Sequence, residues 1–139
     1  MFPDSKVIRW DRDVATNSQI HDNLFQSFVS GEAEILVGTQ MIAKGLDIPN
    51  VRVVGVLLAD LGLHVPDFRA VERVFQLLCQ VVGRAGRGPE GGVAIVQTYQ
   101  PGNYGIRAAA LQDYEDFYLQ ELAFRRTYHY PPFSRLTRL

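Results

Sequence analysis

The sequence predicts an α/β fold, with an open, mostly parallel sheet and helices on both of its faces. Short runs of β-branched and apolar residues alternate along the chain with longer segments whose apolar residues recur every three or four positions. Continuous apolar runs are typical of strands buried on both faces, as in a parallel sheet that helices cover. Strands separated by helical segments predict consecutive βαβ units. The length of 139 residues suits one domain with a core to bury.

The first part of the chain contributes three expected strands and one helix. The apolar runs that predict the strands are Val7–Trp10, Glu34–Gly38 and Val51–Ala59. Apolar residues at helical spacing predict a helix over Ser18–Val29, and Gly31 supplies its stop. These apolar residues are Ile20, Leu24, Phe25 and Phe28.

The second part predicts two helical segments around one strand. A helix is expected to begin near Pro66–Asp67, because proline is tolerated in a first turn and an acidic residue there complements the helix dipole. Val93–Thr98 predicts another buried strand. Tyr104–Tyr128 is predicted to be a long helical stretch that ends before Pro131, since a proline disfavours helical backbone in the preceding residue.

Composition narrows the class of protein without deciding its function. Hydrophobic residues make up 47% of the chain and charged residues 21%, a globular mixture, and no apolar run approaches the roughly 20 residues that cross a bilayer. Cys79 is the only cysteine, and the three histidines are too far apart to form a short metal motif. These features indicate a cytoplasmic protein. The net charge is −1. The basic tail after Glu121 favours a solvated or partner-covered end over a patch that contacts phosphate.

The segment PDFRAVERVFQLLCQVVGRAGRG carries two opposed stripes on a helical wheel. The apolar stripe is Phe68, Val71, Phe75, Leu78 and Val82, and the polar stripe is Arg69, Arg73, Gln76, Gln80, Arg84 and Arg87. The polar face has arginine and glutamine but no lysine, and the planar guanidinium matches phosphate oxygens, although an ordinary solvent-facing side remains the alternative. Glycine weakens a helix by roughly 1 kcal/mol relative to alanine, so the helix is expected to end near Gly83 with the last arginine at its end or in the next loop.

Two motifs in this region resemble those of superfamily 2 helicases. Gln80-Val-Val-Gly83-Arg84-Ala-Gly86-Arg87 is similar to motif VI, and ILVGTQMIAKGLDIPNV, from Ile35 to Val51, is similar to motif V. Three longer segments narrow the resemblance to the primosomal protein N′ (PriA) family. They are DFRAVERVFQLLCQVVGRAGR, VAIVQTYQPGNY and RRTYHYPPFSRL. The resemblance covers almost the whole chain, and the triplet from Gly45 to Asp47 matches the form of some family members and departs from others.

The resemblance implies the C-terminal portion of the second RecA-like (P-loop NTPase-type) lobe of an ATP-dependent DNA helicase that acts in replication restart and primosome assembly. In such enzymes ATP and Mg²⁺ lie in a cleft between two lobes, held mainly by the first. Arg84 and Arg87 match the motif VI arginines that reach the γ-phosphate, and Gln80 matches the glutamine that couples the lobes. An arginine there neutralises charge on the transferring phosphoryl group.

The resemblance places the motif V positions in two groups, one near the nucleotide and one near the DNA backbone. Gly45 and Asp47 match positions near the nucleotide, where a carboxylate can accept a ribose hydroxyl. Thr39 and Gln40 match positions near the DNA backbone, which they would contact without reading sequence. Lys44 is as plausible a solvated loop residue as a phosphate contact. The implied partners are single-stranded or forked DNA, the first helicase lobe, and primosome and single-strand-binding proteins.

Several family features are not in the sequence. It has no G-x-x-x-x-G-K-[ST] loop, no acidic Walker box and no C-x-x-C pair, although full-length family members carry a zinc-binding insertion. The lobe's first strand and helix are also expected to be missing. Residues 1–126 are therefore predicted to be a partial second lobe without ATPase activity of its own, and residues 127–139 the poorly anchored start of a C-terminal domain. The alternatives are another superfamily 2 translocase, RecG-like or RecQ-like, and a non-catalytic remnant that serves as an interaction module.

Overall fold

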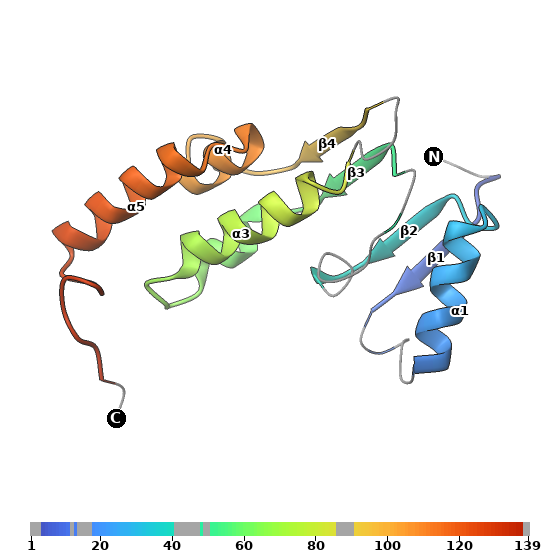
Figure 1. Cartoon of the computed structure of the whole chain (residues 1–139), viewed down its shortest axis with the longest axis horizontal. Coiled ribbons are helices and arrows are strands. Elements are labelled where there is room, and N and C mark those ends of the chain that lie inside the picture. The colour runs from blue at the N-terminus through green and yellow to red at the C-terminus, as the bar shows by residue number, and fades with distance from the viewer. Residues whose placement is uncertain are drawn as a thin grey trace. The chain divides into compact units, whose positions relative to one another are not determined.

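The computed structural model describes residues 4–11, 13, 18–40, 48, 51–85 and 91–137, and it is drawn in Figure 1. The chain divides into two compact units, Met1–Val51 and Arg52–Leu139. Each unit contains one pair of parallel strands with a helical connection between them. The predicted α/β class, with parallel strands joined by helices, is confirmed.

The first unit is a single β-α-β element. Strands β1 (Val7–Trp10) and β2 (Ile35–Gly38) pair in parallel, and α1 (Ser18–Val29) connects them. Trp10 is 2% exposed, and its indole N–H donates to His21 Nδ1 at 2.9 Å, so the end of β1 is fastened to α1. Gly31 follows α1 with a φ of 79°, a left-handed conformation that favours glycine. The predictions for β1, α1 and this stop are confirmed.

The second unit begins with a shorter strand than the sequence predicts. Strand β3 (Val53–Val56) pairs in parallel with β4 (Val93–Val96), where Val53 lies opposite Val93. The predicted strand through Ala59 was wrong at its end, because Leu58 adopts a left-handed φ of 57° and a 3-10 helix, η1 (Ala59–His64), follows. Exposure alternates along both strands, so within the described residues one face of this sheet is more open than the two-sided burial that the apolar runs suggest.

Helix α3 (Ala70–Val82) begins a few residues later than predicted. Asp67 lies in the turn before it, where its side chain accepts a hydrogen bond from the Arg69 N–H at 2.9 Å and its carbonyl accepts one from the Ala70 N–H. The acidic residue therefore stabilises the helix start from outside the helix rather than from its first turn.

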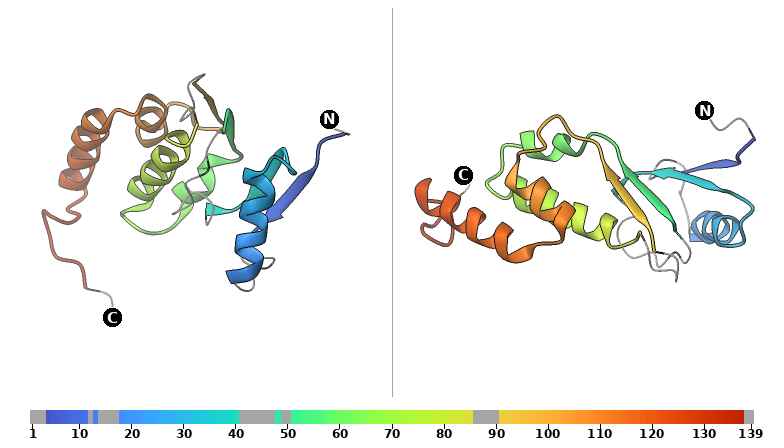
Figure 2. Two further views of the ribbon diagram at one scale, coloured as in Figure 1. Left: turned by 45° about the vertical axis from the view of Figure 1, so that its right-hand side comes forward. Right: turned by 90° about the horizontal axis from the view of Figure 1, so that it is seen from above.

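The long helical stretch predicted over Tyr104–Tyr128 was wrong in one respect, since it consists of two helices. Helix α4 (Tyr104–Leu111) ends at Gln112, whose φ is 56°, and α5 (Tyr114–Thr127) begins immediately after Asp113. The Asp113 carboxylate accepts a hydrogen bond from the Asp116 N–H at 2.9 Å, which satisfies a donor that the new helix leaves open. The views in Figure 2 show α4 between α5 and the β3–β4 sheet.

The core of the second unit lies where α3, α4 and α5 meet. The buried residues that form it are Ala59, Val74, Phe75, Leu78, Ile106, Ala108, Ala109 and Phe117. The rings of Phe75 and Phe117 stack with centroids 3.9 Å apart. Gly105 allows α4 to approach α3 closely, because a Cβ there would lie 2.5 Å from Val71 Cγ1. The predicted apolar stripe is confirmed within α3, where Phe75 and Leu78 are buried and Val71 packs against the core, but Phe68 lies before the helix. The predicted stripe also omitted Val74, which is 4% exposed.

The segment after α5 packs back against the helices. Tyr130 stacks on Phe68 with ring centroids 5.6 Å apart and also lies 6.0 Å from Phe124. The guanidinium of Arg126 lies 5.0 Å from the centre of the Phe133 ring. The expectation that this segment rests on contacts with the long helix therefore fits, and Phe68, just before α3, is a further contact.

Candidate functional site

The polar face of α3 leads to the motif VI candidates, Gln80, Arg84 and Arg87. Arg69, Arg73, Gln76 and Gln80 are all exposed, whereas Phe75 and Leu78 on the opposite side are buried. The helix is amphipathic because its apolar residues recur at helical spacing and face the core. The two predicted stripes are therefore separated in the structure as the wheel indicates.

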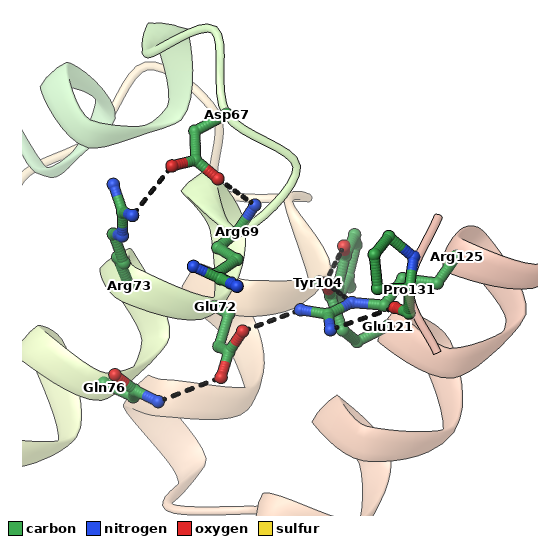
Figure 3. A network of polar contacts seen from close by, with 9 residues as sticks. All are labelled: Asp67, Arg69, Glu72, Arg73, Gln76, Tyr104, Glu121, Arg125 and Pro131. Carbon is green, nitrogen blue, oxygen red and sulfur yellow. Dashed lines mark hydrogen bonds and ion pairs between the residues drawn. The ribbon is translucent and has the colours of Figure 1, made fainter. Parts of the chain in front are cut away.

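Intramolecular contacts occupy the N-terminal half of this face, as Figure 3 shows. Arg73 forms an ion pair with Asp67 at 2.7 Å, and Gln76 donates to the Glu72 carboxylate at 3.1 Å. The Arg69 N–H holds the pKa of the Asp67 carboxyl below its usual value, and the Arg73 charge acts in the same direction against the opposing effect of burial. These polar residues stabilise the start of α3.

The C-terminal end of α3 carries the motif VI residues. The helix ends at Val82, and the Gly83 N–H donates to the Cys79 carbonyl at 2.9 Å. The Arg84 N–H donates to the Val81 carbonyl at 3.0 Å, so the chain continues in a turn. Gln80 is exposed in the last helical turn, and Arg84 is half-buried in the turn that follows. The prediction that the helix ends near Gly83 is confirmed, and Arg87 lies outside the described residues.

The motif V residues belong to the other unit. Thr39 and Gln40 come directly after β2 and are exposed. They follow the carboxyl end of a parallel strand, which is where α/β sheets bind ligands. Gly45, Asp47 and Lys44 lie outside the residues that the structure describes, while Ile48 nearby is buried. Two of the eight candidate residues are thus brought together at the end of α3, and two follow β2.

Asp60 is a buried carboxylate that the sequence reasoning did not single out. It lies in η1, is 4% exposed, and accepts hydrogen bonds from the Thr98 hydroxyl at 2.8 Å and from the Tyr99 N–H at 3.0 Å. Burial acts to raise the pKa of Asp60, but the Tyr99 and Thr98 hydrogen bonds outweigh it, so the pKa lies below its ordinary value. Asp60 therefore ties the segment after β3 to the segment after β4. The sequence signal that could have identified Asp60 is its position directly after an apolar run that predicts a strand.

Neither a metal centre nor a membrane span is found in the described part of the chain. No group of three or more histidine, cysteine, aspartate or glutamate side chains there could hold a metal ion. Among the same residues, no helix is both long and apolar enough to span a bilayer. Cys79 is half-buried on α3, and burial raises the pKa of its thiol.

Comparison with known proteins identifies the family. The model of the helicase conserved C-terminal domain matches residues 7–89, which include β1, the polar face of α3 and both candidate motifs. The chain belongs to the helicase conserved C-terminal domain family. The replication restart protein PriA of Bacillus subtilis (strain 168) is 53% identical to this helicase domain over 136 residues, which cover 98% of the chain and 17% of that relative.

Other comparisons agree on the family and the fold. The replication restart protein PriA of Treponema pallidum is 46% identical over 138 residues, covering 99% of the helicase domain and 21% of the relative. The chain thus spans about one-fifth of the length of the relatives it matches. The C-terminal domain of the DEAD-box protein Dbp5 has a TM-score of 0.56 at 24% identity, and the match covers 88% of this chain and 69% of that one. The predicted resemblance to PriA and the RecA-like fold of a second helicase lobe are confirmed.

Proposed function

We propose that this chain is the second-lobe portion of a cytoplasmic ATP-dependent DNA helicase of the PriA type, which acts in replication restart and primosome assembly. In this proposal residues 1–126 belong to the lobe, and residues 127–139 begin a further domain. The similarity to PriA over nearly the whole chain supports the helicase class. The relatives are about five times longer, so ATP and Mg²⁺ would be held mainly by parts outside this chain.

The placement of Gln80 and Arg84 is the observation on which the proposal rests. Both lie at the C-terminal end of α3, beyond the contacts that occupy its first turns. The amide and guanidinium groups are hydrogen-bond donors, and a guanidinium suits phosphate oxygens, so their chemistry fits a bound nucleoside triphosphate. We assign the same role to Arg87, with Gln80 coupling the lobes.

The motif V residues complete the proposed assignment. Gly45 and Asp47 would lie beside the nucleotide, and Thr39, Gln40 and Lys44 beside the DNA backbone. The exposed positions of Thr39 and Gln40 after β2 support a contact with a large ligand. A hydroxyl or an amide can hold a phosphate without reading sequence, which suits an enzyme that moves along DNA.

The experiment uses a full-length PriA of Bacillus subtilis in which this chain replaces the matching segment, called here the grafted PriA. Arg84→Ala and Arg87→Ala should each lower DNA-stimulated ATP turnover by ~10³-fold or more. Affinity for forked DNA should change by less than about threefold, since an interaction made mainly in the transition state has little effect on ground-state binding. Lysine at either position should not restore turnover, because one ammonium cannot reproduce the planar fork.

The converse result would contradict the assignment. If either variant lost DNA affinity but kept normal turnover per bound enzyme, that arginine would belong to the DNA path. An inactive grafted PriA that folds and binds forked DNA would count against the chain acting as a PriA second lobe at all.

A further inference from the structure

One guanidinium joins helices α3 and α5 and the segment that follows α5. Arg125 Nε donates to Glu121 Oε1 at 2.7 Å within α5, and its Nη2 donates to Glu72 Oε2 on α3 at 2.6 Å. Its Nη1 donates to the Pro131 carbonyl at 3.3 Å. Figure 3 shows these three contacts spreading from one side chain. Arg125 thus uses donors on all three of its nitrogens.

Both glutamates extend the network further. Glu121 Oε2 accepts a hydrogen bond from the Tyr104 hydroxyl at 2.6 Å, which brings α4 into the network, and Glu72 Oε1 accepts one from Gln76. The Glu121 side chain is 8% exposed and that of Arg125 15%, whereas the Glu72 side chain is 31% exposed. Burial acts to lower the pKa of Arg125, but the hydrogen bonds to Glu121 and Glu72 outweigh it and raise the pKa.

An aromatic ring lies against the Arg125 guanidinium. It lies 5.1 Å from the centre of the Phe68 ring, and Tyr130 stacks on that same ring. Such a cation–ring contact strengthens when water is excluded. The network therefore brings together three segments that the site does not use: the residues before motif VI, the helix start at Tyr104 and the turn at Pro131.

Hydrogen bonds and ion pairs of this kind fix the orientation of a helix, which apolar packing alone does not. The buried stripe of α3 keeps the helix on the core, but apolar burial is non-directional. A charged fork with two hydrogen-bonded carboxylates has a specific geometry. The other ion pair at this end, between Arg73 and Asp67, has an arginine side chain that is 56% exposed, so solvent makes it weaker than the Arg125 contacts.

We propose that Arg125 is a positioning residue for the arginine-bearing end of α3, acting through Glu72. Glu72 lies in the first turn of α3, and the helix runs about 15 Å from there to Val82, two residues before Arg84. A helix of this length is stiff, so its orientation at Glu72 sets where Gln80 and Arg84 lie. The inference rests on the proposed function of Arg84. It adds that the segment at Pro131 and the motif VI residues are coupled through one side chain.

The test measures ATP turnover in the grafted PriA. Arg125→Met should lower kcat by about 10- to 100-fold while KM for ATP changes by less than about threefold, because a small displacement of a transition-state group lowers the rate. Glu72→Ala removes the contact of Arg125 with α3, together with the exposed Gln76 hydrogen bond, and leaves the buried Arg125–Glu121 pair intact, so it should show the same split. The matched control is Arg107→Met, which breaks an exposed ion pair with Asp116 between α4 and α5 and should leave kcat within about twofold.

A double-mutant cycle with Arg84→Ala separates positioning from a general loss of structure. If Arg125 acts largely by orienting that arginine, Arg125→Met should lower kcat by a much smaller factor when Arg84 is absent than when it is present. Multiplying effects in the double variant would overturn the proposal, as would unchanged kcat in Arg125→Met and Glu72→Ala. Arg125→Met leaves the buried Glu121 carboxylate without its cation, which could prevent folding. In that case the double variant Glu121→Gln/Arg125→Met removes this charge, and the kcat of the double variant and of Glu72→Ala tests the proposal. Normal turnover in Arg84→Ala would instead overturn the proposed function.

Discussion

Replacing Phe75 by alanine tests whether the stack of α3 on α5 holds the second unit together. Phe75 is 5% exposed, and its ring stacks on Phe117 at 3.9 Å and lies 6.2 Å from Tyr114. Truncating a buried phenylalanine destabilises a protein by ~3–5 kcal/mol, and the cost is highest where neighbours cannot fill the space. Val74 and Leu78 on the same helix are 4% and 1% exposed, so they have little freedom to move inward. We therefore expect the free energy of unfolding to fall by ~5 kcal/mol.

Urea denaturation followed by far-ultraviolet circular dichroism measures this loss as a change in the free energy of unfolding. A loss of ~5 kcal/mol is most of the ~5–15 kcal/mol that stabilises an ordinary domain, so Phe75→Leu, expected near ~1.5 kcal/mol, provides a variant that remains folded. Tyr99→Ala is the control, since this side chain is 81% exposed, and it should change stability by less than ~0.5 kcal/mol. A loss below ~1 kcal/mol in Phe75→Ala would refute the packing argument.

Three further predictions concern pH, catalysis and the end of the chain. Because the folded-state pKa of Asp60 is lowered, its stabilising effect is fully present above the ordinary carboxyl pKa and is lost as pH falls through the folded value. Melting temperatures measured from pH ~7 to ~3 should therefore fall less steeply in Asp60→Asn than in the parent chain. The chain alone should hydrolyse ATP no faster than background, with or without single-stranded DNA, and DNA-stimulated turnover by a rigorously pure sample would disprove this. Limited trypsin digestion should cut first at Arg135 and Arg138, because Arg135 is exposed and chain ends are cleaved early. Sparing of both sites while others are cut would show that residues 127–139 are integral to the lobe.

Local periodicity was enough to predict the elements whose own side chains decide their structure. The β1–α1–β2 unit and the apolar stripe around Phe75 follow from spacing along the chain. The end of α3 follows from Gly83. At the candidate site, the helical wheel put Gln80 on the polar stripe of a helix expected to end near Gly83, and Gln80 is exposed in the last turn of α3.

The failures arose where a single residue or a distant partner decides the structure. The break between α4 and α5 depends on left-handed backbone at Gln112. Its signal in the sequence is Asp113, whose side chain caps the Asp116 N–H at the start of α5. Leu58 shortens β3 in the same way. The contact between Arg125 and Glu72 spans 53 residues, and no local pattern reports a pairing over that distance.

The packing of Tyr130 and Pro131 has a practical consequence for anyone who shortens this protein. A chain that stops at Thr127 would retain every helix and strand in the described residues, and by secondary structure it would look complete. It would nevertheless lose the ring that covers Phe68 and the carbonyl that accepts from Arg125. Freshly exposed aromatic surface favours self-association. A soluble shortened version should therefore extend at least to Ser134, whose hydroxyl donates to the His129 carbonyl and closes the turn.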